Sequence, residues 1–120
     1  MNEVMLIKSF EMFILEIYMK SRKSFYDYFG SFNLEDKEGR DFLIYTVKHL
    51  LELRQKDLVA ILNKEHCESS ERISDLIIKD FLEKFERILK RQRNHLNFEE
   101  FISKLKISFM QIVKDNQFIN

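Results

Sequence analysis

The chain has 120 residues, which is enough for one domain around one hydrophobic core. Hydrophobic residues make up 45% of it, which excludes a disordered chain. The 20 Lys and Arg balance 20 Asp and Glu, which disfavours general nucleic-acid binding, because proteins that bind phosphate backbones usually carry a net basic charge. Proline is absent and only 2 glycines occur, too few for the turns of a sandwich or a barrel, so we expect a single all-α domain over residues 1–120.

The sequence also bears on the compartment. Cys67 is the only cysteine, which excludes a disulfide within the chain and indicates a reducing environment. The first residues, Met1–Val4, lack the basic region and the cleavage site of a signal peptide. No apolar run approaches the roughly 18 residues of a membrane span. We therefore expect a cytoplasmic protein without a membrane span.

The first predicted helix, Glu3–Phe29, has an unusually wide apolar surface. One seam, spaced for a helix face, consists of Ile7, Phe10, Ile14 and Ile17. A second seam consists of Met5, Met12 and Met19, with Leu6 and Phe13 between them. Such a helix must be covered on two faces. The core covers one face, and the other needs a partner, a ligand or a second copy of the chain.

A corner at Gly30–Asn33 separates this helix from the second one. The second helix begins within Leu34–Glu38, with Asn33 or Asp36 as its N-cap, and continues to about Asn63. The polar segment Arg54–Asp57 interrupts it, which predicts a kink or a break into two helices. The residues expected to face the core are Leu43, Val47, Leu50, Leu58 and Ile61.

The third helix follows a polar loop, has Ser69 or Ser70 as its N-cap and runs to about Arg93. Acidic residues crowd its start and basic residues its end, which suits the helix dipole. Its core stripe is Ile73, Ile77, Phe81, Phe85 and Leu89.

The last helix has the clearest local start signal. Asn97 is expected to cap it, with Glu100 reciprocating, and Leu96 and Phe101 occupy the hydrophobic-staple positions. Its core residues are Phe98, Ile102, Leu105, Phe109, Ile112 and Val113. We expect residues 115–120 to form a short tail.

No pattern indicates catalysis or a metal site. Adjacent residues such as His66 and Cys67 rarely coordinate one ion, and no second cysteine or paired histidine completes a set. His95 lies too close to Arg91, and too far from Arg87, for the Arg–His motif of small helical nucleases. Glu68 beside Cys67 raises the pKa of the thiol rather than activating it. We therefore expect no enzyme, no metal and no catalytic residue.

Two features remain that could bind something. A basic cluster ends the third helix: Lys84, Arg87, Lys90, Arg91 and Arg93. Its simpler interpretation is a solvated helix end diluted by nearby glutamates, and the alternative is a surface for phosphate or an acidic partner. His49 shares a helix face with Phe42, Tyr45 and Leu53, where a histidine is usually a hydrogen-bonded core residue. It could instead meet the head group of an acidic ligand.

The order of these elements and the segment His95–Ile102, which opens the last helix, resemble a known family. They are similar to the non-haem globin-type sensor domains of Gram-positive bacteria. Those domains occur in sporulation sensor kinases and stressosome co-antagonists, and as free-standing sporulation-inhibitory proteins of bacilli. The resemblance covers about residues 5–115 and rests on helix order and that one segment.

The resemblance implies a globin-like bundle of four to six helices, a homodimer and a hydrophobic tunnel for a fatty acid. It also implies a regulatory role in which the domain titrates the signal of a histidine kinase. We expect no haem, because His66 falls in a predicted loop and His95 just before a helix cap. Polar head-group contacts are expected from His49 and His95. The expected apolar pocket residues are Phe13, Ile17, Phe42, Tyr45, Leu50, Phe81, Phe85, Phe101 and Phe109.

The leading hypothesis is therefore a cytoplasmic sensor domain that binds a small apolar ligand and acts by protein interaction. The alternative is a small helical subunit or adaptor of a nucleoprotein assembly, such as a CRISPR small subunit or a phage-derived inhibitor, with the basic end of the third helix on RNA or an acidic partner. A compact enzyme built from residues that converge only in space is a third alternative.

Overall fold

The computed structural model describes residues 2–65, 67–91 and 96–117, and no strand occurs among them. The helices of this part are α1 (Glu3–Phe29), α2 (Lys37–Leu53), α3 (Gln55–Lys64), α4 (Ser70–Arg91) and α5 (Phe98–Gln117). The all-α prediction is confirmed, and the number of described helices falls within the expected four to six.

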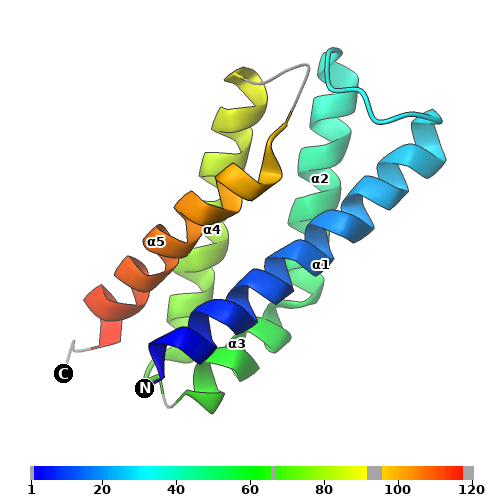
Figure 1. The fold of residues 1–120 in the computed structure, drawn as a ribbon. Helices are drawn as coiled ribbons and strands as arrows, with labels where there is room; N and C mark the ends of the chain where they lie inside the picture. Colours follow the sequence, from blue (N-terminus) through cyan, green and yellow to red (C-terminus); the bar gives the residue numbers. More distant parts are fainter. Residues whose placement is uncertain (1, 66, 92–95, 118–120) are drawn as a thin grey trace.

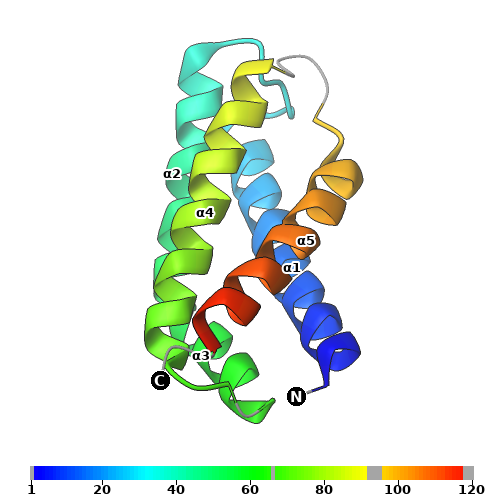
Figure 2. The same ribbon diagram turned by 90° about the vertical axis from the view of Figure 1, so that its left-hand side faces the viewer.

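The helices form an antiparallel bundle. α1, α2, α4 and α5 run alternately up and down, and α3 continues α2 beyond a break (Figure 1, Figure 2). α1 and α4 each pack against α2, α3 and α5. The bundle is elongated, with extents of 47 × 24 × 21 Å. Its relation to the globin fold stays a prediction.

α1 has the bounds that the sequence predicts, and both of its ends have a local cause. The side-chain oxygen of Asn2 accepts a hydrogen bond from the Met5 amide at 3.2 Å, which caps the N-terminus. Gly30 ends the helix at a φ of 79°, and its amide donates to the Tyr26 carbonyl at 2.7 Å. Glycine adopts this left-handed conformation without the steric cost of a Cβ.

The corner between α1 and α2 is tightly packed. Asp36 stands at the N-cap of α2 but its side chain makes no capping bond, whereas the side-chain oxygen of Asn33 accepts from the Glu35 amide at 2.9 Å. A Cβ on Gly39 would lie 3.1 Å from both the Asn33 carbonyl oxygen and the Phe25 ring. Glycine at this position therefore lets α2 approach the end of α1.

The predicted interruption of the second helix is a break at Arg54. This residue has a φ of −108° and a ψ of 16°, outside the helical range, and separates α2 from α3. Neither proline nor glycine lies at the break.

α5 begins where the sequence predicts and extends further than expected. The side-chain oxygen of Asn97 accepts from the Glu100 amide at 3.1 Å, which confirms the predicted N-cap. The helix continues to Gln117, so the prediction of a tail from residue 115 is wrong for residues 115–117. A hydrogen bond from the Gln111 side chain to Asp115, at 2.7 Å, spans four residues and suits this last turn. Residues 118–120 and the predicted end of the third helix at Arg93 lie outside the described residues.

The core lies between all the helices and contains most of the predicted seams. Phe10, Ile14 and Ile17 of α1 are buried, and so are Leu6 and Phe13, which therefore belong to the core seam rather than to the methionine seam. The other large side chains buried almost completely include Phe25, Leu43, Leu51, Leu58, Leu62, Phe81, Phe85 and Phe109. Among the described residues no helix is long and apolar enough to cross a membrane.

Candidate functional site

The second apolar seam of α1 is exposed. We call this surface the methionine face and define it as Met5, Met12, Met19 and Tyr26, which are 45%, 63%, 62% and 58% exposed. The buried residues of α1 lie on the opposite side of the helix. The sequence correctly indicates two apolar faces, and the fold covers one of them.

The methionine face supplies one apolar residue for every seven, whereas a helix-pairing seam uses two, because the exposed Lys8, Glu16 and Lys23 stand between its members. Its members recur every seven residues over six turns of α1, which keeps them on one side of the helix with a small drift per repeat. Methionine is flexible and polarisable, and it packs against partners of varied shape. The face is therefore a row of single exposed apolar side chains between charged ones.

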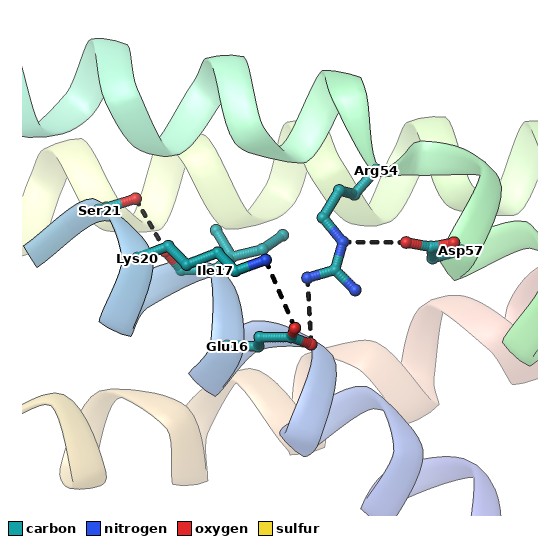
Figure 3. A network of polar contacts seen from close by, with 6 residues as sticks. All are labelled: Glu16, Ile17, Lys20, Ser21, Arg54 and Asp57. Atoms are coloured by element: carbon teal, nitrogen blue, oxygen red, sulfur yellow. Dashed lines mark hydrogen bonds and ion pairs between the residues drawn. The ribbon is translucent and has the colours of Figure 1, made fainter. Parts of the chain in front are cut away.

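A polar cluster beside this face lies at the break between α2 and α3 (Figure 3). We call it the Arg54 cluster. Arg54 Nη1 lies 3.1 Å from Glu16 Oε2 of α1, and its Nε donates to Asp57 Oδ2 at 2.9 Å. Lys20 Nζ lies 3.6 Å from the other oxygen of Glu16. Arg54 therefore connects α1 to the start of α3 at the point where α2 ends.

The same contacts shift two pKa values. The hydrogen bond and charge of Arg54 lower the pKa of Glu16. The hydrogen bond to Asp57 is the largest cause that raises the pKa of Arg54. The guanidinium carbon also lies 5.6 Å from the centroid of the buried Phe13 ring. Arg54 thus has two acidic partners and an aromatic neighbour, which indicates a structural role.

α4 and α5 pack on each other (Figure 2). A surface pocket of about 220 Å³ lies between them, and we call it the basic pocket. Four of the described side chains that line it are cationic and none is acidic. Its apolar floor is buried or half-buried. The lining residues are Lys84, Arg87, Ile88, Arg91, Phe101, Lys104 and Leu105.

One wall of the basic pocket is held by a polar clasp between α4 and α5. Lys84 forms an ion pair with Asp80, one turn earlier on α4, and donates to Ser108 Oγ of α5 at 2.8 Å. Ser108 in turn donates to the other oxygen of Asp80 at 2.6 Å. This clasp neutralises Lys84 and fixes the spacing of the two helices at the pocket.

The arginines of the basic pocket differ from Lys84 in their charge balance. Arg87 and Arg91 are exposed, and within the described part of the chain neither has an ion pair. Lys104 of α5 lies 3.8 Å from Glu100, a weak exposed contact. The uncompensated positive charge of the pocket therefore belongs mainly to the two arginines.

The structure places the predicted site residues in several different environments. Phe42 and Leu50 are half-buried, Tyr45 is 69% exposed, and His49 is exposed beside it with the two ring centroids 6.1 Å apart. The interpretation of His49 as a core histidine is therefore wrong. His95 lies outside the described residues. The predicted pocket residues that are buried in the core are Phe13, Ile17, Phe81, Phe85, Phe101 and Phe109.

Of the described residues predicted for a ligand pocket, only Phe101 lines the basic pocket. Lys104 and Leu105 were not predicted as site residues at all. The helical spacing of Lys84, Arg87 and Arg91 on α4 is visible in the sequence. Their juxtaposition with Lys104 depends on how α5 packs, which the sequence pattern does not specify.

Cys67 is buried, at 7% exposure, and burial is the largest cause that raises the pKa of its thiol. The predicted direction is confirmed, but the acidic contributor is Glu65 rather than Glu68. His66 lies outside the described residues. Within the parts of the chain that are described, no three His, Cys, Asp or Glu side chains are grouped closely enough to hold a metal ion.

Fold and surfaces together define a small helical bundle with an exposed methionine face and a basic pocket. Comparison of the chain with models of known protein families, with curated proteins and with solved structures finds no match. The methionine face and the basic pocket are therefore the features that bear on function.

Proposed function

We propose that the protein is a regulatory sensor-type domain that acts by protein interaction and binds a small apolar ligand. The observation that carries this proposal is the methionine face, a row of exposed apolar side chains on α1 that the core does not use. The seven-residue spacing keeps these side chains on one side of α1, where the same face of a second copy of the chain is their simplest occupant, which gives a homodimer.

The finer parts of this proposal come from the resemblance to globin-type sensor domains. In that view the bundle is a globin-like domain in the cytoplasm, its ligand is a fatty acid, and it needs no haem. It would modulate a signalling pathway such as sporulation control by titrating the signal of a histidine kinase. The double apolar surface of α1 supports an interaction role of this kind, and the choice of pathway rests on the resemblance.

Dimer formation is tested by light scattering after size exclusion over a range of protein concentrations. The variant Met12→Gln with Met19→Gln should lower the dimer fraction, because it replaces two exposed apolar side chains by polar ones of similar length. Leu53→Gln is a matched control, since Leu53 is 64% exposed but lies on α2. A wild-type monomer at every concentration would contradict the homodimer.

Ligand binding is tested on the protein as purified. Native mass spectrometry should show an added mass, and organic extraction should release a lipid that identifies it. A chain that is monomeric and carries no ligand would contradict the proposal as a whole.

A second candidate is the adaptor of a nucleoprotein assembly, and the unpaired Arg87 and Arg91 favour it. Binding of single-stranded RNA that falls with salt, and that is lost in the variant Arg87→Glu with Arg91→Glu, would support this candidate over the first.

A further inference from the structure

The basic pocket combines an apolar floor with a positively charged rim. Its floor consists of Ile88 from α4 and of Phe101 and Leu105 from α5. Phe101 and Leu105 are almost fully buried beneath it, so the floor is rigid core rather than mobile surface. An apolar body on this floor would be removed from water.

The rim of the pocket offers two unpaired guanidinium groups on one helix. Arg87 and Arg91 are four residues apart, which places them on the same face of α4. A guanidinium has a planar fork of donors that matches the two oxygens of a carboxylate or a phosphate. Lys84 is different, because Asp80 and Ser108 already occupy its ammonium group.

The opposite wall adds one more positive charge. Lys104 of α5 has only the 3.8 Å contact to Glu100, with 73% of its side chain exposed. No acidic side chain is among the described residues that line the pocket. An anion entering between α4 and α5 would therefore meet cations from both helices and no opposing carboxylate at the pocket wall.

The size of the pocket limits the ligand. Its volume of about 220 Å³ is below the roughly 300–1,000 Å³ of common ligand pockets. It therefore suits a small ligand, or the head and first part of a longer one.

We propose that the basic pocket binds a small organic anion, with its carboxylate or phosphate on Arg87 and Arg91 and its apolar body on Ile88, Phe101 and Leu105. This inference rests on the ligand-binding part of the proposed function and gives that ligand a place at the surface between α4 and α5. The predicted site residues instead lie mostly in the filled core, and only Phe101 is common to both sets.

The test is a titration of the full chain with defined probes, followed by backbone amide NMR shifts and calorimetry. Decanoate supplies a carboxylate with an apolar body, and phenyl phosphate supplies a phosphate with one. Acetate and decanol are the controls that lack one half of this chemistry. We expect decanoate or phenyl phosphate to shift the amides around Ile88 and Leu105 and to bind at least tenfold tighter than either control.

The variant Arg87→Gln with Arg91→Gln should weaken binding of the same probe tenfold or more. The matched control is Lys79→Gln, because Lys79 is exposed on α4 and does not line the pocket. Lys104→Gln provides a second variant from the opposite wall, for which a smaller loss is expected. Thermal melting of each variant shows whether it is folded.

The possible failures are distinguishable. Binding of decanoate that the arginine variant leaves unchanged, or decanol binding as tightly as decanoate, would overturn this site while the proposed ligand-binding function stands. If no probe binds and the purified protein carries no ligand, the ligand part of the proposed function fails with it. Binding of RNA through the same arginines, without binding of either probe, would overturn the inference in favour of the nucleoprotein candidate.

Discussion

The Arg54 cluster and the basic pocket use the same side-chain chemistry with opposite charge balance. Arg54 lies over the buried Phe13 ring and is compensated by Glu16 and Asp57. Arg87 and Arg91 lie beside the buried Phe101 without an acidic partner among the described residues. An arginine that stabilises the fold is thus both paired and mostly covered, whereas one that can receive a ligand is unpaired and exposed.

The largest effect is expected where the pocket floor is also core. Phe101 is 3% exposed and packs against the rings of Phe81, Phe85 and Phe98. Phe101→Ala should lower the free energy of unfolding by about 3–5 kcal/mol, through lost burial and the cavity left behind. Urea unfolding measures this, with Lys104→Ala as a rim control expected to change it by less than about 0.5 kcal/mol. A loss below about 1 kcal/mol for Phe101→Ala would show that the floor is not part of the core.

The next effect tests the two kinds of arginine directly. Arg54→Ala should lower the free energy of unfolding by about 1–2 kcal/mol, because it removes both ion pairs and the packing of the side chain on Phe13. Arg87→Ala and Arg91→Ala should each change it by less than about 0.5 kcal/mol. Chemical denaturation measures these changes. Equal losses of the free energy of unfolding at all three positions would show that Arg54 stabilises the fold no more than Arg87 and Arg91 do.

The clasp between α4 and α5 should contribute less than the core. Ser108→Ala removes one acceptor of Lys84 and one donor to Asp80, and we expect a loss of about 1 kcal/mol. Ser103→Ala is the control, since the Ser103 hydroxyl donates only to the Glu99 carbonyl within α5, at 3.0 Å. Thermal unfolding of the two variants side by side checks this, and equal melting temperatures would show that the clasp does not stabilise the helix pair.

The smallest expected effect is a pH dependence of the Arg54 cluster. Arg54 lowers the pKa of Glu16 below its ordinary value of 4.5 in the folded state, so the contribution of Glu16 to stability is fully present above that value. It is lost as the pH falls through the lower pKa of the folded protein. Urea unfolding of the wild type and of Glu16→Gln should therefore converge below about pH 4.5. A stability difference that grows with acidity would contradict the sign of this shift.

Local features of the fold were predictable from the sequence because they depend on neighbouring residues. The cap at Asn97 and the end of α1 at Gly30 depend on residues within a few positions. The break at Arg54 coincides with a polar run in the sequence, but its contact with Glu16 of α1 is not local. The prediction of a tail is wrong for residues 115–117 because the polar run there does not end the helix. The backbone of α5 instead stays helical through these residues to Gln117.

The candidate site was predictable only in part. The spacing of Met5, Met12 and Met19 indicated a second apolar face of α1, but the sequence could not show that the bundle would leave it uncovered. The basic residues of α4 were visible as a cluster, whereas the contribution of Lys104 depends on the packing of α5. The hydrogen bond between Lys84 and Ser108 joins residues 24 positions apart, and no local sequence pattern predicts such a contact.

The single cysteine offers a chemical reporter of the dynamics of the corner before α4. Cys67 is buried, and its raised thiol pKa makes it slow to react as well as hard to reach. A thiol reagent will therefore label the native protein at a rate governed by transient opening of this corner. Since the sequence has no other cysteine, that rate can be measured without mutagenesis. Comparing it with and without a bound anion would show whether occupancy of one side of the bundle restrains opening at its other end.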